Sequence, residues 1–128
     1  MPQRATSTNS SVRPRLRIVA GKNIAFGPGK ADLLQALEKT GSITRAADKL
    51  GMSYMRAWTL IRTMNRCFSG PLVDAARGGT KGGGGARLTP IGRQVLQLYR
   101  QMDDKCLKSI QPQWRALRKL LGSTEPRP

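Results

Sequence analysis

The sequence predicts a mainly α protein with a small β component, an α+β fold. Three observations lead to this expectation. Two short helical patterns meet at a glycine turn near residue 51, and a glycine-rich stretch between two short strand patterns follows them. A long helical pattern then starts at residue 90. Two helices joined by a tight turn, followed by a strand–loop–strand unit, predict a winged helix-turn-helix.

The chain has a large excess of positive charge. Its 128 residues contain 23 Lys and Arg against 7 Asp and Glu, a formal net charge of +16. Such a field predicts a polyanionic partner, and double-stranded DNA is the partner we expect. An anionic membrane surface is the weaker alternative, because most of the charge lies outside amphipathic helices. Since no run approaches ~20 apolar residues, we expect no membrane span.

Residue types that support catalysis or metal binding are scarce. The chain has no His, and Cys67 and Cys106 are far apart in the sequence and match no metal-ligand spacing. We therefore expect no enzyme, no metal and no cofactor. Two lone thiols and the lack of a leader pattern predict a cytoplasmic location, associated with the bacterial nucleoid through DNA.

The order of patterns along the chain predicts its domains. Residues 1–13 are polar and rich in Ser and Thr, which favours a disordered basic arm. Residues 14–110 are expected to form the winged helix-turn-helix domain. It would begin with a β-hairpin around Gly21 and a helix over residues 30–39.

The helix-turn-helix pattern runs from Ser42 to Arg66. Ser42 and Ser53 are the expected N-caps of its two helices, and Gly51 permits the sharp turn between them. The outward positions of the second helix include no acid. On such a face Arg can bind a guanine edge, and a Thr methyl or Met can contact a thymine methyl. The DNA contacts expected from the two helices are Ser42, Thr44, Ser53, Tyr54, Met55, Arg56, Thr59 and Arg62.

Arg56 is the strongest candidate for reading a base, because it lies in the first turn of the second helix. The alternative for each arginine taken alone is a solvated helix face. The helix-turn-helix pattern within so basic a chain favours contact with nucleic acid.

Strand candidates at residues 72–75 and 86–88 flank the stretch GGTKGGGG, and this arrangement predicts a glycine-rich wing. Backbone without side chains can approach a sugar–phosphate chain closely and bind anions through its amides. The expected wing contacts are Arg77, Lys81, Gly82, Gly83 and Arg87. A nucleotide-binding enzyme loop is the alternative. It is disfavoured because Lys81 precedes the longer glycine run and no Ser or Thr follows a Gly-Lys pair.

Thr89 and Pro90 predict the start of a long helix that extends to about residue 110. Residues 111–128 would form a short amphipathic segment and a tail. The apolar stripe within residues 111–121 fits a helix at a dimer interface. The alternative is a docking segment for a separate regulatory partner.

Two segments carry a resemblance to a known family: GSITRAADKLGMSYMRAWTLIRTMN and PLVDAARGGTKGGGGARLTPIGRQVLQLY. They resemble the N-terminal winged-helix domain of the ModE family of molybdate-responsive transcriptional regulators, which is distantly related to the LysR-type DNA-binding domain. The resemblance implies a homodimer that binds palindromic operators. It also implies that the hairpin, the first helix and the long C-terminal helix contribute to dimerisation.

Full-length members of that family also carry a C-terminal module that binds molybdate. The chain ends at Pro128, soon after the long helix, so we expect this ligand-sensing module to be absent. A non-specific architectural protein that binds nucleic acid is the alternative function, and the net charge and the basic arm support it.

Overall fold

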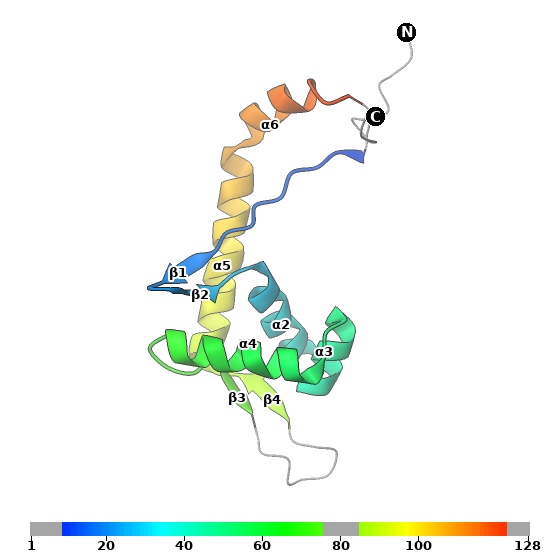
Figure 1. Cartoon of the computed structure of the whole chain (residues 1–128). Coiled ribbons are helices and arrows are strands. Elements are labelled where there is room, and N and C mark those ends of the chain that lie inside the picture. The colour runs from blue at the N-terminus through cyan, green and yellow to red at the C-terminus, as the bar shows by residue number, and fades with distance from the viewer. Residues whose placement is uncertain (1–8, 76–84, 123–128) are drawn as a thin grey trace. The chain divides into compact units, whose positions relative to one another are not determined.

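The computed structural model describes residues 9–75 and 85–122. Residues 15–100 form one compact unit, and the described residues on either side of this range belong to a second unit. The elements occur in the order β1 (Ile18–Ala20), β2 (Asn23–Phe26), α2 (Pro28–Thr40), α3 (Ile43–Leu50), α4 (Tyr54–Cys67), β3 (Val73–Ala75), β4 (Ala86–Leu88), α5 (Pro90–Ser109) and α6 (Gln111–Arg118) (Figure 1). The expected mainly α fold with a helix-turn-helix and short antiparallel strands is confirmed.

The N-terminal hairpin is attached to the rest of its unit by aromatic side chains. β1 and β2 pair antiparallel, and the chain reverses at Gly21, whose φ of +61° is a conformation that favours glycine. The buried ring of Phe26 meets the rings of Phe68 and Tyr99 edge to face, with centroids 6.1 and 5.0 Å away. The Tyr99 hydroxyl donates a hydrogen bond to the Leu16 carbonyl at 2.7 Å, which links α5 to the hairpin.

The main core lies between α2, α3 and α4. Helix α2 buries Leu33, Leu34 and Leu37, which the helical period places on one face. Helix α3 presents Ala46 and helix α4 presents Ala57, and both side chains are completely buried. Because alanine is small, the two helices can pack closely against α2 and against each other.

The turn between α3 and α4 has the hydrogen bonds of a Schellman motif. Gly51 has a φ of +68° and donates its N–H to the Asp48 carbonyl at 3.1 Å. The Met52 N–H donates to the Ala47 carbonyl at 3.0 Å. These bonds satisfy carbonyls that the end of α3 would otherwise leave without partners, and they set the direction in which α4 begins.

The second hairpin, β3–β4, is held by a side chain of α4. The Asn65 side-chain oxygen accepts hydrogen bonds from the N–H groups of Leu72 at 2.8 Å and Val73 at 3.1 Å. Its amide nitrogen donates to the Val73 carbonyl at 3.2 Å. On the other strand, the Ala86 N–H donates to the Gly41 carbonyl at 3.0 Å, next to the end of α2. The base of the hairpin is therefore fixed to both α4 and α2.

Helix α5 begins against residues 71 and 72, where the chain enters β3. The Thr89 side-chain oxygen accepts from the Gly92 N–H at 2.9 Å, as expected for an N-cap, and its hydroxyl donates to the Pro71 carbonyl at 2.7 Å. A Cβ placed on Gly92 would lie 2.1 Å from the Leu72 carbonyl oxygen. The Leu-Thr-x-x-Gly pattern thus combines a helix cap with a close approach between α5 and the chain entering β3.

Some expectations fall on residues that the structure leaves undescribed. Most of the glycine-rich part of the wing lies within 76–84, and most of the N-terminal arm lies within 1–8. The division of the chain at residues 13 and 110 stays a prediction.

We predict that Gly92→Ala lowers the free energy of unfolding by about 2–3 kcal/mol, because the new methyl group would collide with backbone that cannot move aside. Gly29→Ala is the matched control, since a Cβ at Gly29 would meet nothing within 4 Å. Thermal or urea denaturation compares the two variants. Equal stability of both would contradict the close approach.

We predict that Asn65→Ala costs about 1–3 kcal/mol of stability, because two backbone N–H groups and one carbonyl lose their partner. Asn65→Asp keeps an oxygen to accept both N–H groups and should lose less. The check is a urea titration of the two variants beside the parent chain. A loss from Asn65→Asp as large as that from Asn65→Ala would show that the accepted bonds contribute little.

Candidate nucleic-acid interface

The exposed face of α4 is a single stripe of side chains. Met55, Thr59, Arg62 and Arg66 repeat at the spacing that places residues on one side of a helix, and all four are exposed. Met55 is 66% exposed. The opposite face of α4 buries Ala57, Ile61 and Met64 in the core. The packing therefore leaves the whole stripe free to meet a partner.

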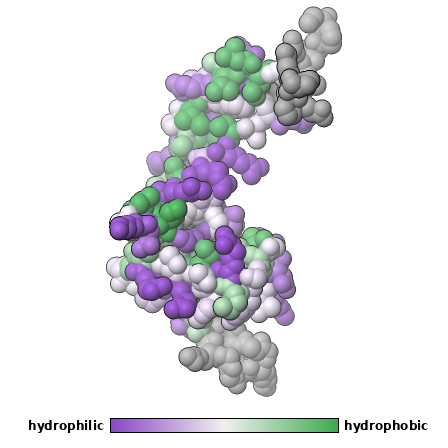
Figure 2. All heavy atoms as spheres, in the orientation of Figure 1, coloured by the Kyte–Doolittle hydropathy of each residue, from purple (hydrophilic) through white to green (hydrophobic). Residues whose placement is uncertain are grey.

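Positive charge dominates this face. Helix α4 contains Arg56, Arg62 and Arg66 and has no Asp or Glu in its sequence. Hydrophilic side chains gather over part of α4 on the face of the molecule seen in Figure 2. Because α4 itself carries no acid to offset them, the three guanidinium groups favour an anionic partner.

The two serines predicted as N-caps occupy those positions. The Ser42 hydroxyl oxygen accepts from the Arg45 N–H at 3.1 Å, and the Ser53 hydroxyl oxygen accepts from the Arg56 N–H at 3.0 Å. Both caps satisfy N–H groups that lack a partner within the helix. Each hydroxyl retains its own proton, so the start of α3 and the start of α4 can each donate to a phosphate oxygen.

The threonine hydroxyls of α4 bond to their own helix. The Thr59 hydroxyl donates to the Met55 carbonyl at 2.9 Å, and the Thr63 hydroxyl donates to the Thr59 carbonyl at 3.1 Å. Such bonds use the only donor of the side chain. Thr59 therefore offers its surroundings a methyl group and oxygen lone pairs.

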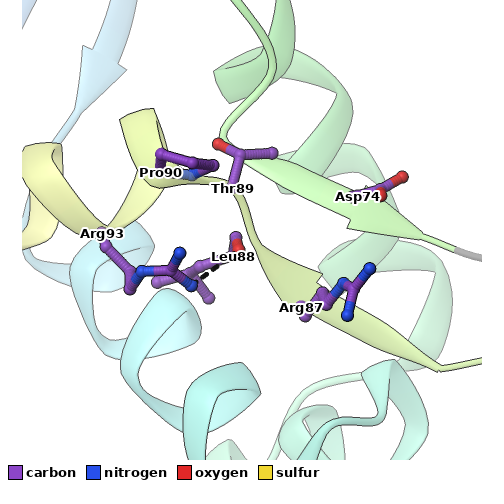
Figure 3. Close-up of a pocket in the computed structure, with 6 residues that line it drawn as sticks. All are labelled: Asp74, Arg87, Leu88, Thr89, Pro90 and Arg93. Carbon is purple, nitrogen blue, oxygen red and sulfur yellow. Dashed lines mark hydrogen bonds between the residues drawn. The ribbon is translucent and has the colours of Figure 1, made fainter.

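The base of the wing carries a second basic cluster. Arg87 on β4 is exposed and lies opposite Asp74 on β3 in the strand register. Arg93, in the first turn of α5, points toward the same strand and donates to the Leu88 carbonyl at 3.2 Å (Figure 3). Together with Thr89 these residues line an open hollow of about 270 Å³. Both arginines border it, against one acid, so this surface also suits an anion.

The structure places the predicted contact residues in three groups. Ser53, Tyr54, Met55, Arg56, Thr59 and Arg62 are on or next to α4, Ser42 and Thr44 are at the start of α3, and Arg87 is on β4. The remaining wing residues, Arg77, Lys81, Gly82 and Gly83, lie outside the described residues. Whether each residue contacts DNA stays a prediction.

Two residues that shape this surface, Asn65 and Arg93, were not predicted from the sequence. Asn65 fixes the start of β3 to α4. A single amide near the end of a helix belongs to no sequence pattern, so this contact could not be predicted. Arg93 lies beside Arg87 at the hollow. It could have been proposed from the sequence, because it is a basic residue in the first turn of the helix that follows the wing. Within the described ranges, no helix combines the length and apolar character needed to cross a membrane.

The chain is similar in sequence to several known proteins. The chain is 45% identical over 74 residues to the molybdenum-pterin-binding protein MopB of Rhodobacter capsulatus, which covers 58% of this chain and 27% of that protein. It is 38% identical over 89 residues to the molybdenum transport protein ModE of Azotobacter vinelandii, which covers 70% of this chain and 33% of that protein. It is 44% identical over 72 residues to the DNA-binding transcriptional dual regulator ModE of Escherichia coli. That match covers 56% of this chain and 27% of the E. coli protein.

These matches confirm the resemblance to ModE proteins, although the chain spans only about a third of their length or less. Residues 30–93 also match the family model for bacterial regulatory helix-turn-helix proteins of the lysR family. The match begins within α2, contains α3, α4, β3 and β4, and ends in the first turn of α5. Because the matched residues make up half of the chain, the chain belongs to the bacterial regulatory helix-turn-helix proteins of the lysR family.

Proposed function

We propose that this chain is a DNA-binding transcriptional regulator of the ModE type that reads double-stranded DNA with α4. The exposed, acid-free stripe on α4 carries the proposal. A major groove admits one α-helix, and the second helix of a helix-turn-helix is the one that enters it. We assign the chain no catalytic step. Binding to DNA would place it on the nucleoid in the cytoplasm.

Arg56 and Arg62 are the proposed readers of bases. A guanidinium group can donate two hydrogen bonds to the O6 and N7 atoms of guanine, which gives about 1–3 kcal/mol of discrimination against other bases. Arg56 lies in the first turn of α4, and Arg62 lies at the centre of the exposed stripe. Both side chains are exposed, so little rearrangement is needed before they contact a base edge.

The caps and the wing are proposed to hold the DNA backbone. Ser42, Ser53 and Thr44 lie at helix starts, where hydroxyl and amide donors suit phosphate. Arg87 and the wing residues Arg77, Lys81, Gly82 and Gly83 would contact the neighbouring backbone. Because Asn65 links α4 to the start of β3, a contact made by the wing would fix how α4 lies in the groove.

We further propose that the chain acts as a homodimer on a palindromic operator. Val19 on β1, Ile24 on β2 and Leu98 on α5 are apolar and are 64%, 44% and 50% exposed. Val19 and Ile24 are partners in the strand register, so they form one apolar patch. Exposed apolar surface of this kind is typical of a protein interface. The segment 111–121, with Leu117 52% and Leu120 85% exposed, would take part in dimerisation or bind a separate regulatory partner.

A non-specific architectural protein is the second candidate, and the net charge of +16 is the observation that favours it. Such a protein binds through phosphates alone, so its affinity is the same for all sequences. Competition between a selected DNA site and random DNA separates the candidates. A specific regulator should prefer its site by roughly 10³-fold or more.

We predict that Arg56→Ala reduces discrimination between the selected site and random DNA by about 1–3 kcal/mol, through loss of a base contact. Arg87→Ala, the matched control on the wing, should weaken binding to all sequences alike and lower the salt slope by about one. Fluorescence anisotropy at several salt concentrations measures both effects. Unchanged discrimination in Arg56→Ala would remove Arg56 from the readers of bases.

We predict that a footprint on the selected DNA shows two protected half-sites on one face, with centres about 34 Å apart or a multiple of that distance. Each protomer would place one α4 in the groove. Leu98→Lys should weaken the dimer and the paired footprint together, because it puts a charge in the apolar interface. Sedimentation velocity supplies the independent readout of mass. A single unpaired half-site bound by a monomer would contradict the dimer.

A further inference from the structure

The exposed face of α4 offers a narrow set of chemical groups. Major-groove adenine is matched by the amide of Asn or Gln, and cytosine by a carboxylate acceptor. Helix α4 has no Asp, Glu or Gln, and its single amide, Asn65, is used at the start of β3. Its outward groups are arginines, a methionine, a tyrosine and threonines. This set suits guanine, through Arg, and thymine, through apolar contact with the 5-methyl group.

The hydrogen bond made by Thr59 decides which of its groups can contact a base. Its hydroxyl donates to the Met55 carbonyl at 2.9 Å, so the side chain has no donor left for a base. The groups that remain are the γ-methyl and the oxygen lone pairs. Thr59 nevertheless lies in the middle of the exposed stripe, between Met55 one turn before it and Arg62 one turn after it.

Met55 enlarges the apolar area around that methyl. It precedes Thr59 by four residues, so their side chains are neighbours on the helix surface. Because 66% of Met55 is exposed, its burial contributes little to the stability of the isolated chain. A flexible thioether beside a methyl group forms an apolar patch on a face that is otherwise charged or hydroxylated.

We propose that Thr59, together with Met55, contacts the 5-methyl group of a thymine in each operator half-site and thereby selects thymine at that position. The inference rests on the proposed function and specifies what α4 reads. Side chains one turn apart lie about 5–6 Å from each other, and successive bases rise about 3.4 Å. The guanine bound by Arg56 or Arg62 should therefore lie within about two base pairs of this thymine.

The test begins with the full chain and a random DNA library, from which repeated rounds of binding select the preferred sequence. Each thymine of that sequence is then replaced, one at a time, by deoxyuridine, which removes only the methyl group. One replacement per half-site should weaken binding about three- to fivefold, the effect expected for one buried methyl group. The other replacements serve as controls within the same DNA.

Two variants assign the effect to Thr59. Thr59→Ser keeps a hydroxyl that can bond to the Met55 carbonyl and removes the methyl group, so its preference for thymine over deoxyuridine at that position should be smaller than that of the parent chain, with Met55 supplying what remains. Thr59→Val keeps a methyl group and removes the hydroxyl, so it should retain the preference for thymine. Both changes lie on the exposed face, and circular dichroism checks that each variant is folded.

The outcomes separate this inference from the function on which it rests. If selection enriches no sequence, specific DNA binding fails and the inference fails with it. If a sequence is enriched but no deoxyuridine weakens binding, the contact with a methyl group is wrong and the regulator remains. If Thr59→Ser keeps the full preference for thymine over deoxyuridine, the methyl group of Thr59 does not contact the base, which also overturns the proposal.

Discussion

The three hydrogen bonds of Asn65 connect the two parts of the surface proposed to meet DNA. Its side chain satisfies two N–H groups and one carbonyl at the start of β3, and its backbone belongs to α4. Backbone polar groups that lie partly buried need such partners, because leaving them unpaired costs as much as a lost hydrogen bond. The chain leaving α4 thus enters the wing at a fixed position.

The beginning of α5 strengthens the same junction from the other side. Thr89 bonds to Pro71 and Leu72, and the missing side chain of Gly92 lets α5 lie against Leu72. The segment 71–73 is consequently held by α4 before it and by α5 after it. These contacts hold the buried side of α4 in place, while the opposite side carries exposed side chains. Rigid support under exposed contact groups is what recognition of a fixed groove requires.

Much of this architecture could be predicted from the sequence, because it depends on local rules. Ser42 and Ser53 cap their helices, Gly51 makes the turn, and Thr89 starts α5 where Pro90 favours it. The junction could not be predicted, because it joins Asn65 to residues 72 and 73 through contacts that have no sequence period. The same holds for the Tyr99 hydroxyl on the Leu16 carbonyl, which links positions 83 residues apart.

In the candidate site, too, the features that follow from local spacing could be predicted and those that depend on the folded structure could not. A basic, acid-free helix face is visible in the sequence, since helical spacing alone places Met55, Thr59 and Arg62 together. The direction in which a hydroxyl donates cannot be read from the sequence. Thr59 could have donated outward, and only the structure shows its bond to the Met55 carbonyl. Arg93 illustrates a third case. Its charge was plain, but its place beside Arg87 depends on how α5 leaves the wing.

The central claim is that α4 lies in a major groove and reads guanine there. Methylation interference tests it most directly: dimethyl sulfate places a methyl group on guanine N7, an atom that faces the major groove. The full chain is bound to partly methylated DNA carrying its selected site, and bound and free fractions are compared at each guanine. The account predicts that methylation of at least one guanine per half-site excludes the DNA from the bound fraction. Equal methylation of every guanine in both fractions would contradict it.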